Sequence, residues 1–392
     1  MNNDELQVLG TENRKSNNWK WIVAIACVVL TIVCYLIYNR CSSTGNTLPM
    51  SQEGSTISPA LQHAADSLLN DKLTEINGLQ GQVIIMNVQT GEILAMAGRE
   101  RNFEGKFQPC QNFAYQQELG ALTMTVSLLV GLESGKAHLS DVVDTGNGVW
   151  QIDDDRIMKD HNWRRGGYGE VTLDRALGVS SNIGISKTIW SLFKGHEQDY
   201  FNKLDSMSFG QPNSIEGIEG LRPSVYSSPK DSDWVNKDIL WSAIGYNRKI
   251  APIQMLTFYN AIANNGKMVK PTLVPGTSEV VNEQIAKKEN IALIQQTLEH
   301  VVSQGLGHKA GSAKILVAGK TGTSQVNEYY EGDNTVSEYQ VAFCGFFPAN
   351  KPKYSMIVSL NKIGLPASGG GMAGDAFHNI VEWMIDNGML NK

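Results

Sequence analysis

The stretch GQVIIMNVQTGEILAMAG, residues 81–98, decides the fold of this chain. Apolar runs at 83–86 and 93–96 flank a Gln-Thr-Gly turn, a pattern that predicts two antiparallel strands joined as a hairpin. Two further strand-like runs, VAFCGFF at 341–347 and YSMIVSL at 354–360, lie near the other end of the sequence. Strands at both ends with helices between them predict an α+β fold, in which the first hairpin and the last strands share one antiparallel sheet.

The segments between these strands have helical periodicity. Residues 121–135 predict a buried helix, because their apolar side chains recur every three or four positions and Gly135 can end it. Residues 174–193 predict a helical segment that is broken at Ser180 and Asn182. Further helices are predicted at 61–73, 252–263 and 376–385.

The N-terminal region differs in composition from the rest. Residues 21–38, WIVAIACVVLTIVCYLIY, carry no charge, and at about 1.5 Å per residue they nearly span a hydrocarbon core of roughly 30 Å. Basic residues within 1–20 precede this segment, which predicts one transmembrane helix with a cytoplasmic N-terminal tail. Residues 39–60 are rich in Ser, Thr, Gly and Pro and predict a flexible linker, so 61–392 would form a folded domain outside the cytoplasm.

Composition limits the functions open to the chain. It is 42% hydrophobic with a net charge of -6, which is typical of a globular protein without the basic excess that binds phosphates, so no nucleic acid partner is expected. The cysteines lack metal-ligand spacing, and the run Asp153-Asp154-Asp155 lacks the glycine and glutamate of a calcium loop. We therefore expect no metal and no cofactor.

The sharpest local motif is AGKTGTS at residues 318–324. Its Gly-Lys-Thr is part of a nucleotide-binding P-loop, but such a loop needs a glycine where Lys314 stands, so phosphate binding is not predicted. The alternative is the K-T-G strand of serine transpeptidases and β-lactamases, whose companion motifs are S-x-x-K and S-x-N. Ser180-Ser181-Asn182 supplies the second of these companions.

Both motifs belong to a longer ordered set: GEILAMAG, DTGNG, LDRALGVSSNIGISK, APIQM, YNAIANNGK, VAGKTGTSQ and FCGFFPANKPKY. Over residues 61–385 this set resembles the class B penicillin-binding proteins, the D,D-transpeptidases of peptidoglycan synthesis. The resemblance implies a β-lactamase/transpeptidase-like fold with an antiparallel sheet flanked by helices. It also implies that the domain is held on the outer face of the bacterial cytoplasmic membrane by a single span. Because only about forty residues lie between the predicted span and the first predicted strand, we expect this chain to lack the pedestal domain that usually separates span and catalytic domain in this family.

The resemblance assigns substrate binding to five residues: Asn182, Lys320, Thr321, Gly322 and Thr323. Lys320 would lend positive charge, the two threonine hydroxyls would hold a substrate carboxylate, and Asn182 would donate to a substrate amide carbonyl. Ser180 stands where the family has a proton relay. The strand edge at 321–323 could pair with an extended peptide. The expected partners are a peptidoglycan stem peptide or another protein of cell-wall synthesis.

The nucleophile motif of the family is degenerate in this chain. The family has E-P-G-S-T-x-K-P followed by L-E-x-G, and the ungapped counterpart here is ELGALTMT at 118–125, followed by LESG. Ala121 therefore replaces the nucleophilic serine and Met124 replaces the lysine that activates it. Alanine has no oxygen to attack a carbonyl and methionine has no nitrogen to accept a proton, so the resemblance implies a transpeptidase domain without acyl-transfer activity.

Two alternatives remain open at the level of the sequence. The chain could be an active transpeptidase or carboxypeptidase that uses Thr123, Thr125 or Ser180 as an unrecognised nucleophile, although Ser180 has no evident base in the sequence. Alternatively, the pocket could be a relic filled by its own side chains, because Met124 can pack where a lysine stood. His161 is read as a surface histidine, and the aromatic residues around it as local packing.

Overall fold

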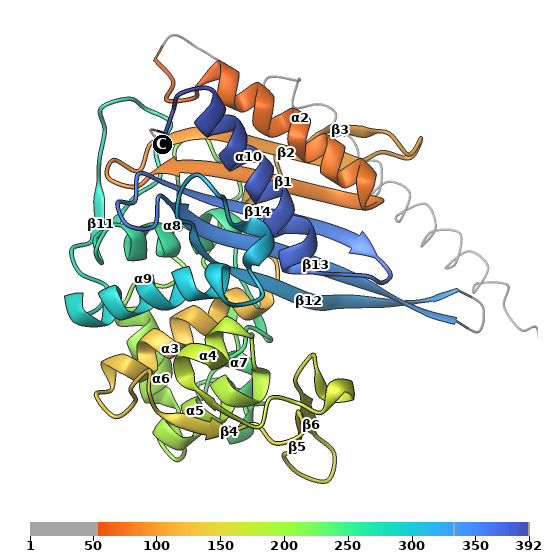
Figure 1. The fold of residues 1–392 in the computed structure, drawn as a ribbon, viewed down its shortest axis with the longest axis vertical. Coiled ribbons are helices and arrows are strands. Elements are labelled where there is room, and N and C mark those ends of the chain that lie inside the picture. The colour runs from red at the N-terminus through yellow and green to blue at the C-terminus, as the bar shows by residue number, and fades with distance from the viewer. Residues whose placement is uncertain (1–53, 332–333, 391–392) are drawn as a thin grey trace, which may run out of the picture. The chain divides into compact units, whose positions relative to one another are not determined.

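A six-stranded antiparallel sheet organises residues 54–331 and 334–390, the part of the chain that the computed structural model describes (Figure 1). The strand order is β12-β13-β14-β1-β2-β3. The predicted hairpin forms β1 (Gly78–Asn87) and β2 (Ile93–Arg101), and the two C-terminal runs form β13 (Asn334–Phe347) and β14 (Tyr354–Ile363). Because β1 pairs with β14, the first hairpin and the last strands do share one sheet. The predicted α+β fold is confirmed.

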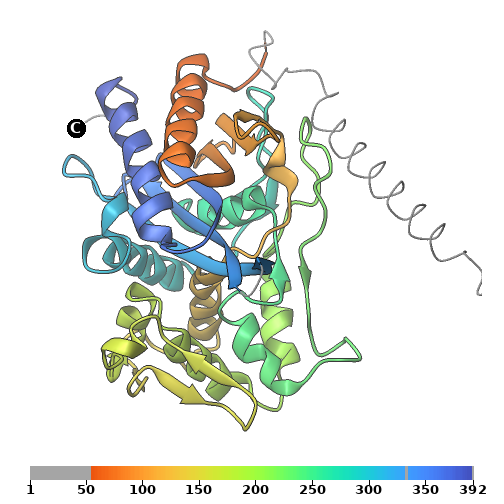
Figure 2. The same cartoon turned by 90° about the vertical axis from the view of Figure 1, so that its right-hand side faces the viewer.

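Both faces of the sheet are buried. Alternate side chains of residues 83–86 enter two different hydrophobic cores, one on each face. The helices α2 (Pro59–Glu75) and α10 (Asp375–Asp386) cover one face and lie side by side (Figure 2), while α8 (Pro252–Ala263) packs on the other. Burial on both faces explains why the strand is continuously apolar instead of alternating between apolar and polar residues.

The remaining helices form most of a second layer next to the sheet, at the bottom of Figure 1. Every side chain of α8 is buried, since this helix lies between the sheet and that layer. The other helices are α3 (Thr123–Glu133), α4 (Leu173–Gly178), α5 (Asn182–Phe193), α6 (Gln198–Ser206), α7 (Ile239–Ser242) and α9 (Lys288–Ser303). Short helical turns are η1 (Asn112–Ala114), η2 (Gly120–Leu122), η3 (Trp163–Arg165), η4 (Asn236–Asp238), η5 (His308–Ala310) and the π-helical η6 (Gly369–Gly374).

Small strand pairs connect these helices. They are β4 (Val142–Asp144) with β7 (Glu170–Thr172), β5 (Val149–Gln151) with β6 (Ile157–Lys159), β8 (Val225–Tyr226) with β9 (Arg248–Lys249), and β10 (Met268–Val269) with β11 (Val280–Asn282). The sheet is completed at its two edges by β3 (Phe107–Pro109) and β12 (Ala318–Glu331). The long β12–β13 hairpin carries the K-T-G motif on an edge strand.

Most of the predicted helices agree with the structure within a few residues. The break predicted in 174–193 separates α4 from α5, and residues 121–135 form η2 followed by α3. Residues ahead of the predicted domain boundary at 61 also make contacts with the fold. Thr56 already donates from its hydroxyl to the Ile93 carbonyl oxygen at 2.6 Å, and Ile57 is buried in the core, because both residues pack against β2.

The predicted membrane segment lies near the N-terminus, at residues 21–38. Within residues 54–331 and 334–390, no helix is both long and apolar enough to cross a membrane. The cytoplasmic tail at 1–20, the predicted span at 21–38 and most of the predicted linker lie outside the described residues.

Candidate functional site

The start of α3 is docked directly on the K-T-G strand. Gly120 has a φ of +55°, and a Cβ at this position would lie only 2.7 Å from the Thr323 carbonyl oxygen. A Cβ at Gly322 would collide with the Leu119 carbonyl oxygen. Glycine at both positions allows the two backbones to touch. The contact places Ala121 beside the strand segment that carries Lys320 and Thr323.

Neither Ala121 nor Met124 carries a side-chain group that could act as a nucleophile or a base. Ala121, which the motif resemblance predicts at the serine position of the family, is half-buried and packs against the core. Met124 is fully buried in the core that fills the space between the sheet and the helical layer. The side chain at position 124 therefore contributes to packing.

Lys320 lies at the centre of the site. Its side chain is fully buried, and its ammonium donates to the Ser180 hydroxyl, to the Thr321 carbonyl oxygen at 2.9 Å and to the Thr321 hydroxyl at 3.4 Å. Among the described residues, no carboxylate lies within ion-pair distance of it. Removal from water without a compensating negative charge lowers the pKa of Lys320 to about 7. Near neutral pH, the charged and the neutral form of the amine are therefore both populated.

Ser180 reaches this lysine through an unusual backbone conformation. It sits between α4 and α5 with a φ of +52°, in the left-handed region that non-glycine residues rarely adopt. Its hydroxyl contacts Lys320 and lies 3.5 Å from the Thr321 hydroxyl. The sequence indicated no evident base for Ser180, whereas in the structure a buried amine with a lowered pKa is in contact with it.

Asn182 is the first residue of α5, and its side chain is tied to the neighbouring hairpin. Its amide donates to the Lys159 carbonyl oxygen at 2.9 Å. Ser181 caps the same helix by accepting from the Gly184 amide at 2.9 Å, and it donates to the buried Asp160 carboxylate at 2.7 Å. These bonds fix the S-S-N segment to the end of β6, next to the K-T-G strand.

The two threonines of the K-T-G strand differ in their surroundings. Thr321 is buried beside Lys320, whereas Thr323 is exposed and its hydroxyl accepts from the Gly369 amide at 3.0 Å. The structure thus brings together Ser180, Lys320 and Thr321 by direct contact, whereas Thr323 contacts Gly369 and Asn182 contacts Lys159.

The candidate nucleophiles on α3 are inaccessible. Thr123 and Thr125 are both buried, and the Thr125 hydroxyl lies 2.8 Å from the hydroxyl of the buried Tyr259. A group enclosed in this way cannot reach a bound substrate. Of the three alternatives in the sequence, only Ser180 remains accessible.

His161 is exposed, in agreement with its reading as a surface histidine, but nothing in the sequence indicates which residues surround it. Its Nε2 atom lies 3.0 Å from the Tyr168 hydroxyl, and partial removal from water together with the positive charges of Arg165 and Lys320 lowers the pKa of His161. Such an effect requires His161 to lie near Lys320. No sequence signal links these two residues, because nearly half of the chain separates them.

Comparison with known proteins places this geometry among transpeptidase domains. Residues 81–382 match the family described as the penicillin binding protein transpeptidase domain. Penicillin-binding protein PbpB of Mycobacterium tuberculosis is 24% identical over 368 residues, which cover 85% of this chain and 52% of that protein. The peptidoglycan D,D-transpeptidase FtsI of Escherichia coli is 22% identical over 324 residues, covering 78% of this chain and 51% of that protein. The chain spans about half the length of these curated relatives.

Solved structures agree with the fold. The transpeptidase domain of Burkholderia pseudomallei penicillin-binding protein 3 superposes with a TM-score of 0.72 at 21% identity, covering 87% of this chain and 98% of that one. Penicillin-binding protein 3 of Mycobacterium tuberculosis in complex with aztreonam gives a TM-score of 0.70 at 21% identity, covering 86% and 79%. At these identities the likeness establishes the fold alone.

Proposed function

Because the chain belongs to the penicillin binding protein transpeptidase domain family, we propose that it acts in peptidoglycan synthesis as a non-covalent binder of stem peptides. In this role it would be a scaffold or regulator for other proteins of cell-wall synthesis. The proposal rests on a contrast between two groups of residues in the site. Ala121 and Met124 lack the two reactive groups, whereas Lys320, Ser180 and Thr321 keep their mutual contacts.

Binding would rest on charge and on the edge strand. A peptide carboxylate near Lys320 would raise the pKa of the amine and hold it in the charged form. The hydroxyls of Thr321 and Thr323 would donate to the same carboxylate. Since β12 is an edge strand, the backbone groups on its outer side would pair with an extended peptide, although the Thr321 carbonyl oxygen already accepts from Lys320. Asn182 would supply its second amide hydrogen to a peptide carbonyl oxygen.

A second candidate function is acyl transfer at Ser180, which the contact with Lys320 favours. A neutral Lys320 amine would take the hydroxyl proton while the Ser180 oxygen bonds to the carbonyl carbon, and would return it to the departing amine nitrogen when the C–N bond breaks. The local backbone offers no oxyanion donors, however. The Ser180 and Ser181 amides already donate to the Leu177 and Ala176 carbonyl oxygens, so this function ranks second.

The two candidates predict different results with a fluorescent penicillin. The unmodified protein is expected to form no adduct that survives denaturation, because Ala121 has no hydroxyl and the backbone around Ser180 offers no oxyanion donor. The measurement is in-gel fluorescence followed by mass spectrometry, with Ser180→Ala as the control. A band that maps to Ser180 and disappears in this variant would instead support the second candidate. A band that maps to any other residue would contradict both.

We also propose that residues 21–38 anchor the protein in the membrane, with the folded domain outside. The charge asymmetry around the segment and the membrane-associated chemistry of peptidoglycan synthesis support this topology. A reporter enzyme that is active only outside the cytoplasm should work when fused after Lys392. Activity of the same reporter only when fused ahead of Met1 would reverse the proposed orientation.

A further inference from the structure

The β5–β6 hairpin lies against the first turns of α5, the helix that begins with Asn182. The Asn182 amide donates to the Lys159 carbonyl oxygen at the end of β6. One turn further along α5, the Lys187 ammonium donates to the Asp144 carbonyl oxygen at 2.8 Å. The same ammonium lies 5.4 Å from the centre of the Trp150 ring on β5. The hairpin is thus packed against the helix that presents Asn182 to the site.

Asp160, the residue after β6, binds the chain on both sides of Asn182. Its carboxylate accepts from the Ser181 hydroxyl at 2.7 Å and from the Ile183 amide at 3.0 Å. Asp160 and these two partners are buried, whereas Asn182 between them is only partly buried. The Asp160 amide also donates to the Gly148 carbonyl oxygen at 3.0 Å, which closes the base of the hairpin. Both neighbours of Asn182 are therefore bound to a single carboxylate.

The Asp160 carboxylate has no counter-ion. Among residues 54–331 and 334–390, no lysine, arginine or histidine side chain lies within ion-pair distance of it. Burial raises the pKa of Asp160, although the hydrogen bonds from the start of α5 oppose this effect. A buried carboxylate without a cation carries a desolvation cost. The charge does supply strong hydrogen bonds to the start of a helix, where the backbone dipole favours a negative group.

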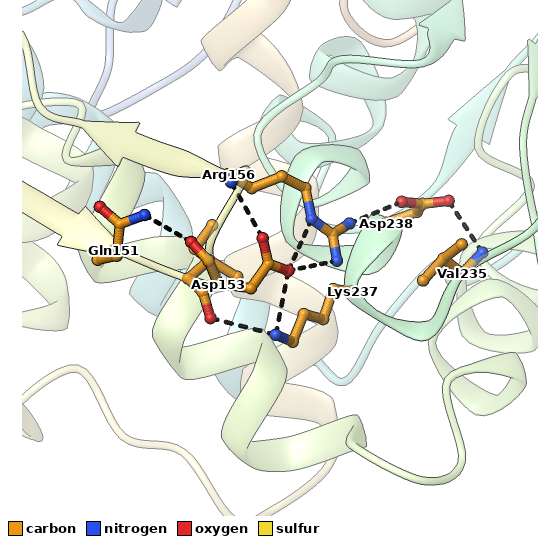
Figure 3. Close-up of polar contacts among 7 residues, drawn as sticks. Gln151, Asp153, Arg156, Val235, Lys237 and Asp238 are labelled. Atoms are coloured by element: carbon orange, nitrogen blue, oxygen red, sulfur yellow. Dashed lines mark hydrogen bonds and ion pairs between the residues drawn. The ribbon is translucent and has the colours of Figure 1, made fainter.

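The tip of the hairpin is fixed to η4 (Figure 3). Asp153 accepts from Arg156 at 2.7 Å and from Lys237 at 3.1 Å, and these partners hold the pKa of Asp153 well below its usual range. Arg156 also donates to Asp238 at 3.3 Å. Lys237 also donates to the Ile152 carbonyl oxygen at 3.1 Å. The hairpin is therefore tied to α5 at its base and to η4 at its tip.

We propose that Asp160 is a positioning residue, which aims the Asn182 amide at a bound peptide by fixing the residues on either side of it, and that the β5–β6 hairpin holds Asp160 in place. The inference rests on the proposed peptide binding and adds a residue that controls the geometry of the same site. Asp160 is buried behind the first turn of α5 and touches no ligand itself. Its effect on binding therefore passes through Asn182.

A double-mutant cycle tests whether Asp160 acts through Asn182. Binding of an N-acetylated peptide ending in D-Ala-D-Ala to the full-length protein in nanodiscs would be measured by calorimetry. Asp160→Asn and Asn182→Ala are each expected to weaken binding about tenfold, since each costs the peptide one well-aligned hydrogen bond from Asn182. The double variant should bind no more weakly than Asn182→Ala alone. Losses that add to about a hundredfold would overturn the inference, because Asp160 would then act independently of Asn182.

Hydrogen exchange followed by mass spectrometry gives a second measurement that needs no peptide. In Asp160→Asn, the amides of residues 181–184 are expected to exchange at least tenfold faster than in the parent protein, because two charge-assisted bonds to this segment are lost. Thr172→Ala is the matched control. It removes the cap of α4, where Thr172 accepts from the Arg175 amide at 3.2 Å, and should leave exchange at residues 181–184 unchanged. Unchanged exchange at these residues in Asp160→Asn would show that the carboxylate does not restrain Asn182.

Asp153→Asn keeps the inference testable if Asp160→Asn does not fold. Asp153 is partly exposed at the tip of the hairpin, and its loss of charge should speed exchange at residues 181–184 about threefold. A loosened tip without any change at residues 181–184 would overturn the inference, because the hairpin would then not hold Asp160 in place. A parent protein that shows these exchange changes but binds no peptide would contradict the proposed function, while the positioning of Asn182 by Asp160 would stand.

Discussion

Changing Ala121 to serine and Met124 to lysine together is expected to give the protein covalent penicillin binding, at a rate about a thousandfold or more above that of either single variant. The close packing of Gly120 on Thr323 keeps position 121 beside the K-T-G strand, and the Lys320–Ser180 contact is already present. Each single change leaves out half of the reacting unit, since a hydroxyl without a base stays protonated and a base without a nucleophile has nothing to activate. Stopped-flow or gel-based acylation with a fluorescent penicillin measures the gain.

The same pair of changes tests whether the pocket has closed around Met124. A lysine at this fully buried position carries a desolvation cost, which lowers its pKa or destabilises α3 unless polar groups such as Ser180 and Asn182 receive it. Ala121→Ser with Met124→Leu is the matched control, because it keeps the hydroxyl and the apolar packing. A double variant that melts like the parent protein but is not acylated would show that the site differs from an active one at more than two residues. The stem-peptide proposal would then lose its main support.

Replacing Lys320 by methionine is expected to stabilise the folded protein by roughly 2–4 kcal/mol at pH 7 and to abolish binding of D-Ala-D-Ala peptides. Burial lowers the pKa of Lys320 to about 7 from its ordinary 10.5, so the folded state holds this proton less tightly than the unfolded chain. The resulting penalty is fully present below pH 7 and fades as the pH rises toward 10.5. Methionine has a similar length and no charge, and it removes the penalty.

Thermal melts between pH 6 and about 10.5 check this expectation, with the exposed Lys194→Met as the control. The gap in melting temperature between Lys320→Met and the parent protein should shrink as the pH rises through this window. A variant that is less stable than the parent at every pH would contradict it, because the ammonium would then be a net stabilising group. Stabilisation coupled to loss of binding would identify Lys320 as a residue kept for function at a cost in stability.

Local sequence patterns determined much of the fold. The apolar runs of residues 83–86 and 93–96 need only their neighbours to form a hairpin, and α8 begins at Pro252 as the proline and the helical period predict. The proposal that the nucleophile is lost also comes from the sequence, since it depends on the identity of Ala121 and Met124 and on an ungapped motif. Such features follow from short-range geometry or from chemical composition, and neither requires knowledge of the packing.

The tertiary structure alone decided what the remaining site residues can do. Lys320 is an ordinary lysine in the sequence, and its pKa falls because the folded chain buries it without a carboxylate. Ser180 contacts Lys320, which could serve as its base, and the positive charge of Lys320 also acts on His161. Lys320 belongs to a strand that is far from both residues along the chain. Thr125 is excluded as a nucleophile because it is buried and hydrogen-bonded to Tyr259. Burial and long-range contacts are properties of the packed chain, so no local pattern predicts them.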